Sequence, residues 1–210
     1  GLAFRAPATE GGSMAMSITS ARGPVRLLGC VLLSMVLTAC WGGTSREEPK
    51  MDMQQAGQRA EEILDDTMEA IQPPVKWVRG AAMESPCSTD FNDPTGTTTV
   101  VRSRNILTVV SERRRDELLK MVQRHWEKRG AKDFDVHSDE KTPRIRATTA
   151  GGLTVTLDVG YAGNVYIRAA FGCAQDSAMT YPEGTPGQPG GPEEPERIPN
   201  ERSSYWSVDS

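Results

Sequence analysis

The stretch LTVTLDVGYAGNVYIRAAF, residues 153–171, decides the fold. Apolar and polar side chains alternate along residues 153–159, and they alternate again along residues 165–171. A period of two residues is typical of a β-strand that has one buried face and one solvated face. The turn at residues 161–164 is short enough to join the two strands as an antiparallel hairpin. The sequence therefore predicts an antiparallel sheet that packs on a core through one face only.

The same alternation extends towards the N-terminus. Residues 145–149 alternate apolar and polar side chains, and the glycine-containing turn at residues 150–152 joins them to the strand that follows. Phe134 and Val136 mark a shorter strand before them. These segments extend the hairpin into an antiparallel meander whose last strand ends next to Cys173.

Two helices and two more strands are expected in the first half of the chain. Residues 51–72 and 112–129 carry apolar side chains at three- and four-residue steps, which predicts two amphipathic helices. The acidic residues of the first helix are expected to face solvent. Residues 75–79 and the β-branched residues 97–108 predict strands, and residues 84–96 form a turn-rich loop between them.

The elements together predict an α+β fold. Ser111 is expected to cap the second helix at its N-terminus. The predicted order is α-β-β-α-β-β-β-β, a two-layer sandwich in which a mostly antiparallel sheet of about five to six strands packs on two helices. This folded domain covers residues 51–173. Residues 174–210 are rich in proline and glycine and carry seven acidic residues and two arginines, so they are expected to form a disordered acidic tail.

The N-terminal region indicates export. Residues 27–37 are apolar and follow two arginines, and about eleven apolar residues are too few to span a bilayer as a helix. The segment resembles a bacterial lipoprotein signal peptide, and Leu37-Thr38-Ala39-Cys40 resembles its lipobox. The resemblance implies that residues 1–39 are removed and that a lipid on Cys40 holds the chain on the extracytoplasmic face of the cell membrane.

Two further readings concern the same region. Residues 40–50 would form the lipidated tether. Met14 or Met16 can serve as the translation start, in which case residues 1–13 are not translated. The alternative to lipidation is a plain secretory signal in which Cys40 has no role.

The cysteines divide according to this signal. Cys30 would leave with the signal peptide, and Cys40 would carry the lipid. Cys87 and Cys173 remain as an even pair in an exported chain, and such a pair predicts a disulfide. The alternatives are two free thiols, or metal ligation together with one of the two histidines.

The sequence carries no pattern that indicates a catalytic residue, a metal site or a cofactor. His125 and His137 are expected to be structural, and Asp158, Glu84 and Asp139 are the nearest candidates for hydrolytic acids. Without residues 1–39 the chain has a net charge of −6, and residues 174–210 carry −5 of it, so the folded part is nearly neutral and a nucleic-acid partner is not expected.

The second helix is basic. A solvated helix face is the usual explanation for such a run, and the sharper hypothesis is a patch that rests on anionic lipid headgroups or cell-wall polymers. The residues concerned are Arg113, Arg114, Arg115, Lys120, Arg124 and Lys128.

The whole pattern resembles the small uncharacterised lipoproteins of high-GC Gram-positive (actinobacterial) type. The shared features are the lipobox, the short polar tether, the first helix, Trp77, the Cys87/Cys173 pair and the final meander. The resemblance implies a membrane anchor and an extracytoplasmic site. The expected function is a binding or interaction module with an envelope protein or cell-wall partner. The alternatives are a carrier of a lipid or other apolar ligand, and an envelope hydrolase.

Overall fold

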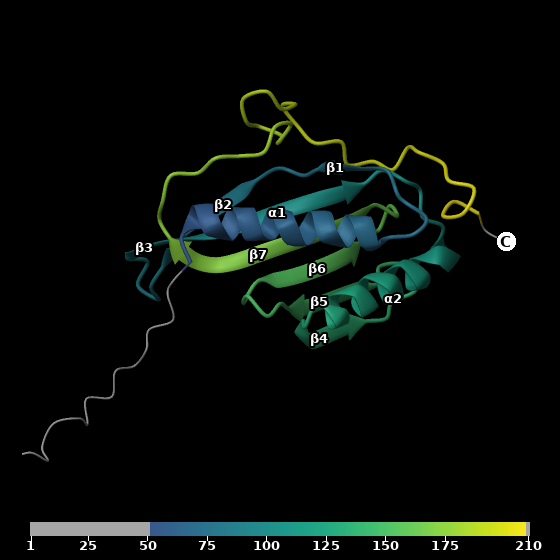
Figure 1. Cartoon of the computed structure of the whole chain (residues 1–210), viewed down its shortest axis with the longest axis horizontal. Coiled ribbons are helices and arrows are strands. Elements are labelled where there is room, and N and C mark those ends of the chain that lie inside the picture. Colours follow the sequence, from purple (N-terminus) through teal and green to yellow (C-terminus); the bar gives the residue numbers. More distant parts are fainter. Residues whose placement is uncertain (1–50, 209–210) are drawn as a thin grey trace, which may run out of the picture. The chain divides into compact units, whose positions relative to one another are not determined.

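The structure, a computed structural model, describes residues 51–208. The predicted signal peptide, the tether and Cys40 lie outside the described residues. Over residues 51–208 the chain forms two helices and seven strands (Figure 1): α1 (Met53–Ala70), β1 (Trp77–Arg79), β2 (Met83–Ser88), β3 (Pro94–Ile106), α2 (Glu112–Lys128), β4 (Lys132–His137), β5 (Arg144–Thr148), β6 (Thr154–Val159) and β7 (Val165–Gln175).

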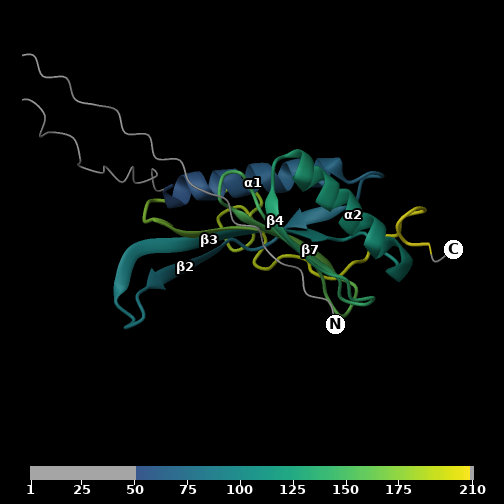
Figure 2. The same cartoon turned by 90° about the horizontal axis from the view of Figure 1, so that it is seen from below.

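The predicted α+β class is confirmed. The strands form one antiparallel sheet in the order β1-β3-β7-β6-β5-β4, and β2 pairs with β3 beside β1. Seen along the sheet, both helices lie on the same side of it (Figure 2). Neither helix among the described residues is long and apolar enough to cross a membrane.

The strand count exceeds the predicted five to six because β2 lies in the segment predicted as a loop. Pro86 belongs to this strand and is paired with Thr98 of β3. Proline has no N–H to donate, and it is therefore tolerated in a strand at the edge of a sheet. The register of β2 shifts between Pro86 and Ser88. Pairing with the long β3 makes a strand of a sequence whose composition favours turns.

The core lies between the sheet and the helices, as the alternation of apolar and polar residues along the strands predicts. The apolar residues of β5, β6 and β7 are buried, and the intervening residues are more exposed. Leu64 of α1 and Leu118 of α2 are fully buried against them. The indole Nε1 of Trp126 donates to the hydroxyl of Thr67 over 3.0 Å, so a buried hydrogen bond joins the two helices.

The helix starts are fixed in two different ways. Asp52 and Gln55 form a capping box at the start of α1, which satisfies two of the free N–H groups there. Ser111 occupies the N-cap position of α2, as predicted, but its side chain makes no capping hydrogen bond. Its hydroxyl instead donates to the carbonyl of Val208 over 2.8 Å. The Ser111 hydroxyl therefore binds the C-terminal segment instead of capping α2.

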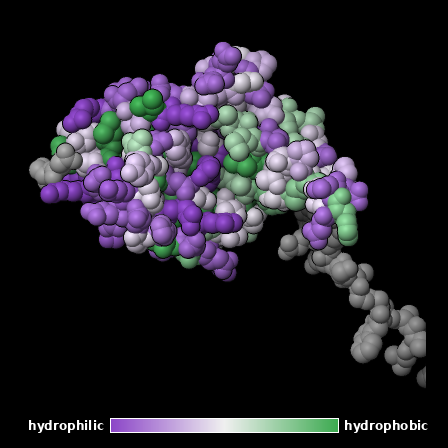
Figure 3. Space-filling model, turned by 180° about the vertical axis from the view of Figure 1, so that it is seen from behind, coloured by the Kyte–Doolittle hydropathy of each residue, from purple (hydrophilic) through white to green (hydrophobic). Residues whose placement is uncertain are grey.

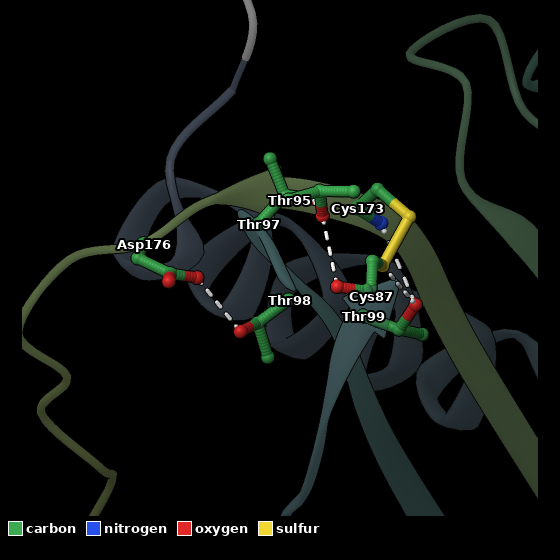
Figure 4. Close-up of a disulfide and its surroundings, with 7 residues drawn as sticks. All are labelled: Cys87, Thr95, Thr97, Thr98, Thr99, Cys173 and Asp176. Atoms are coloured by element: carbon green, nitrogen blue, oxygen red, sulfur yellow. Dashed lines mark hydrogen bonds between the residues drawn. A yellow bond between two sulfur atoms is a disulfide. The ribbon is translucent and has the colours of Figure 1, made fainter. Parts of the chain in front are cut away.

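The predicted disulfide between Cys87 and Cys173 is present (Figure 4). It joins β2 to β7 past Thr99 of β3, whose hydroxyl lies 3.5 Å from the sulfur of Cys87. The two cysteines are 86 residues apart, and loop-closure entropy assigns about 4–5 kcal/mol to a cross-link of that length. Because β3 pairs with β7, the last strand of the meander lies at the centre of the sheet.

The prediction of a disordered tail from residue 174 differs from the structure. Strand β7 continues to Gln175, and residues 176–208 then pass around the β1 edge of the sheet (Figure 1). Trp206 is fully buried in the core, and its indole donates to the carbonyl of Pro73 over 2.7 Å. The amides of Asn200 and Glu201 donate to the carbonyl of Leu107. The composition of residues 174–210 predicts disorder because they contain few apolar residues, but the burial of the single residue Trp206 is enough to hold the segment on the domain.

Replacement of Trp206 by alanine should destabilise the whole domain. The change removes a fully buried indole, which typically lowers the free energy of unfolding by about 3–5 kcal/mol. The matched control is Ile198→Ala in the same segment, where 72% of the side chain is exposed and the change should stay within about 0.5 kcal/mol. Urea unfolding followed by circular dichroism measures both. Equal midpoints for the two variants would mean that the segment is not packed in solution.

Candidate binding surface

The two faces of the sheet differ in what covers them. Both helices pack on one face of the sheet (Figure 2). The strand residues that alternate with the buried ones belong to the other face, here called the open face. Figure 3 views the molecule from the side opposite to the helices, and hydrophilic residues dominate the left part of that view. A hollow of about 500 Å³ lies on the open face. Its lining includes Arg144, Arg146, Thr154, Thr156, Asp158 and Arg168.

The register of the strands places three of these side chains in one row across the sheet. Thr156 of β6 is paired with Arg146 of β5 on one side and with Arg168 of β7 on the other. Adjacent strands lie about 4.8 Å apart, so the two arginines start about 10 Å apart with the hydroxyl between them. The row therefore presents two guanidinium groups and a hydroxyl from three neighbouring strands.

Two carboxylates partly neutralise the cations of the open face. Asp158 forms an ion pair with Arg168, and Asp135 lies 3.6 Å from a guanidinium nitrogen of Arg144. Arg146 is exposed and makes no ion pair with any residue from 51 to 208. About half of the side chains of Arg144 and Arg168 is also exposed. Among the described residues, the face thus holds Arg146 without an ion pair between two arginines that are partly paired.

The C-terminal segment borders this face on the β3 side. The side-chain amide of Asn105 donates to the carbonyl of Glu196 over 2.8 Å. Pro195 and Arg197 line a smaller hollow of about 200 Å³ together with Tyr166 and other residues of the sheet. The segment therefore covers one side of the open face and leaves the region over β5, β6 and β7 uncovered.

The helix-covered face contains a buried cluster of charges. Arg104 of β3 is fully buried, and its Nη2 donates to Glu61 and to Asp65 of α1, each over 2.6 Å. Arg102 is also buried and donates to Glu84 of β2 over 2.7 Å. The acids of α1 were expected to face solvent, and for Glu61 this is wrong because only 12% of its side chain is exposed. The cluster fastens α1 to the sheet and is structural.

Loss of the fully buried Arg104 should weaken this cluster, although Arg79 also pairs with Glu61 and lies 3.9 Å from Asp65. Arg104→Ala removes the cation that Glu61 and Asp65 share, and breaking a buried pair typically costs about 3–5 kcal/mol of unfolding free energy. The control is Arg146→Ala on the open face, which should change the free energy by less than about 0.5 kcal/mol. Denaturant unfolding of both variants checks the contrast. Similar losses would contradict the division into a structural arginine and a surface arginine.

The structure divides the basic run of α2. Arg115 is buried, and its Nη1 donates to the carbonyl of Lys141 over 3.0 Å. Arg114 pairs with Glu117 and lies over the ring of Tyr205. Lys120 pairs with Asp116 over 2.6 Å, and the exposed members of the predicted patch are Arg113, Lys120, Arg124 and Lys128. Two of the six predicted residues thus hold other parts of the chain in place.

His125 belongs to a polar link between the two helices. Its Nε2 lies 2.8 Å from a carboxylate oxygen of Asp66, and Arg129 also donates to that carboxylate. Burial acts to raise the pKa of Asp66, but the hydrogen bonds from Arg129 and His125 outweigh it and hold the pKa below its usual value. These residues line a hollow of about 340 Å³ beside Trp126. Because Asp66 accepts from both partners, the link is a structural tie between α1 and α2.

The link should make the stability depend on pH in one direction. A carboxyl with a lowered pKa in the folded state stabilises the fold at a pH above its unfolded pKa, near 3.8. That contribution is lost as the pH falls through the folded pKa. The free energy of unfolding of the wild type should therefore exceed that of Asp66→Asn at pH 6, and the difference should shrink below about pH 4. A difference independent of pH would contradict the charged link.

The three residues considered as hydrolytic acids lie in separate surroundings. Glu84 projects towards the helices and is held by Arg102. Asp158 lies on the open face with Arg168. Asp139 accepts hydrogen bonds from the amides of Lys141 and Thr142 in the loop before β5. Within residues 51–208 no three His, Cys, Asp or Glu side chains are grouped closely enough to hold a metal ion.

Comparison with known proteins gives a structural likeness but no family. No protein-family model matches the sequence, and no curated protein does. A crystal structure of a DUF4853 family protein from Actinomyces odontolyticus ATCC 17982 is similar at 13% sequence identity and a TM-score of 0.41. The similarity covers 62% of this chain and 77% of that one. A likeness of this degree carries no information on activity or ligand.

Sequence reasoning missed the open-face arginines as a group. The alternation placed Asp158 and Arg168 at solvated positions, but their relation to Arg144 and Arg146 depends on which residues face each other across three strands. The sequence did contain one indication of this group: arginines stand at solvated positions both in residues 144–148 and in residues 165–171, which were predicted to belong to one meander.

Proposed function

We propose that the protein is a lipid-anchored binding module on the extracytoplasmic face of the cell membrane, and that it engages an envelope partner through the open face of its sheet. The observation that carries the proposal is the open-face hollow with its three arginines, which the helices and the C-terminal segment leave uncovered. The lipobox that ends at Cys40 supports the anchor. The Cys87–Cys173 disulfide fits an oxidising, extracytoplasmic compartment.

The way in which the open face is held suits a binding surface. Its side chains stand on strands that are paired on both sides, and the disulfide joins β2 to β7 across β3. A surface that is rigid before it binds loses less conformational entropy on association. The polar side chains of the open face are therefore presented in a fixed arrangement, as recognition requires.

The carrier and hydrolase alternatives have less support. The layer between the helices and the sheet is filled by large buried side chains, among them Leu64, Leu118 and Trp206, and a carrier needs that space for its ligand. The open-face hollow has Met83, Val101 and Ala170 in its lining, but it also places three arginines and Asp158 there, and burying such charges under an apolar ligand is unfavourable. The three candidate acids of a hydrolase lie apart from one another.

The proposal predicts a partner that is lost when the hollow is filled. Thr154 lines the hollow, and Thr154→Trp places an indole there. Crosslinking in intact cells should give a discrete partner band with the wild type, which should weaken at least tenfold with Thr154→Trp, since displacing an interface contact of this size costs about 1.4 kcal/mol or more. The matched control, Glu127→Trp on the exposed side of α2, should keep the band.

A second arm of the same experiment tests the anchor. Cells grown with labelled palmitate should label the wild type, and Cys40→Ala should lose both the label and the membrane fraction. Label that survives in Cys40→Ala would contradict the anchor. A wild type that gives no partner band, or a band that Thr154→Trp leaves unchanged, would contradict the binding face.

A further inference from the structure

We propose that Arg146, Thr156 and Arg168 form a clasp for the phosphate groups of an anionic envelope polymer. The inference rests on the proposed function and specifies the partner of the same face. The clasp is defined by the register, which pairs Thr156 with both arginines, and by the exposure of the two arginines on either side of the half-buried Thr156.

The donor geometry fits a phosphate group. Two guanidinium groups whose strands lie about 10 Å apart can reach towards each other above the hydroxyl that stands between them. Guanidinium groups bind phosphate through paired, charge-assisted N–H···O bonds, and a hydroxyl adds a third donor. The tetrahedral phosphate accepts hydrogen bonds from several directions at once, and the clasp supplies donors from three neighbouring strands.

The surroundings of the clasp favour an extended ligand. The hollow of about 500 Å³ is much larger than one phosphate group needs. Arg144 lies two residues from Arg146 on the same strand and the same face, about 7 Å along it. Thr154 and Thr99 continue the hydroxyl-bearing surface on the other side of the row. A chain that runs along the strands therefore meets a third cation on one side of the clasp and further donors on the other side.

The carboxylates of the open face set the strength of the site. Asp158 pairs with Arg168, and Asp135 lies near Arg144, so only part of the positive charge is available before a ligand binds. A phosphate group must compete with Asp158 for Arg168. Asp158 thus acts as an internal competitor and limits the affinity for a single phosphate group, so a chain that carries several phosphate groups should bind better than one.

Polyphosphate of about fifteen units and polyglutamate of matched charge serve as the two probes, each titrated into the purified protein by calorimetry at fixed ionic strength. Polyphosphate should bind at least tenfold more tightly than polyglutamate. Arg146→Gln should weaken polyphosphate at least tenfold, since it removes charge-assisted hydrogen bonds. The matched control is Arg124→Gln, an exposed arginine on α2, which should alter the affinity less than twofold.

Asp158→Asn gives the sharpest test because it predicts a gain. Removing the competing carboxylate should free Arg168 and tighten polyphosphate binding about threefold or more. A merely structural role of this ion pair predicts no gain. Weaker binding in Asp158→Asn, or an unchanged affinity in Arg146→Gln, would overturn the clasp.

The probes also separate this inference from the proposed function. Equal or tighter binding of polyglutamate would overturn the phosphate assignment in favour of an acidic protein partner on the same face. Failure of both probes, with a partner band that Thr154→Trp still removes in cells, would overturn the clasp and leave the binding face standing.

Discussion

The antiparallel pairing of β3 with β7 is the constraint on which the rest of the structure depends. It joins residues 97–106 to residues 165–175 and so connects the β1–β2–β3 part of the sheet to the β4–β7 meander. The partners are far apart in sequence, so the loop-closure entropy of the pairing has to be offset before the sheet is complete. The disulfide joins β2 to β7 across β3, next to this pairing, and it lowers the conformational entropy of the unfolded chain.

The charges on β3 show what this central position demands. Arg102 and Arg104 occupy inward-facing positions where the alternation of a half-buried strand favours apolar residues. They are tolerated because α1 and β2 supply carboxylates. In addition, the guanidinium group of Arg104 lies 5.0 Å from the ring centroid of Trp77, and that of Arg102 lies 5.2 Å from the ring centroid of Tyr181. The helix thus packs on β3 through paired charges and on the meander through apolar side chains.

The sequence predicted the parts of the fold in which local pattern and tertiary structure agree. The strict alternation of β6 and β7 reappears as their buried positions, and both predicted helices lie within two residues of α1 and α2. Two features depend on partners that local pattern does not reveal. Strand β2 exists because β3 extends far enough to pair with it, and the C-terminal segment is ordered because Trp206 fills the core. A lone tryptophan after a proline-rich stretch was the available signal.

The candidate site was less predictable for the same reason. Single arginines at solvated strand positions are ordinary, and their arrangement as a row needs the register of three strands. The sequence instead drew attention to α2, where arginines cluster in order along the chain. The structure uses Arg115 to hold the loop before β5 and Arg114 to hold Tyr205. Proximity in sequence was therefore a poor guide to a shared surface.

The edges of the sheet give a further reason to place binding on the open face. An exposed edge strand offers free N–H and C=O groups that can pair with another chain. Beside the edge strand β1, the C-terminal segment lines a hollow together with Trp77 and Arg79. At the other edge, the register of β4 shifts between Lys132 and Asp135, and Asp133 there has a left-handed backbone with φ of 54°. An irregular, charged strand is a poor template for pairing. Strand addition is thus disfavoured at the β4 edge. The open face offers another mode of binding, which is recognition by side chains across the sheet.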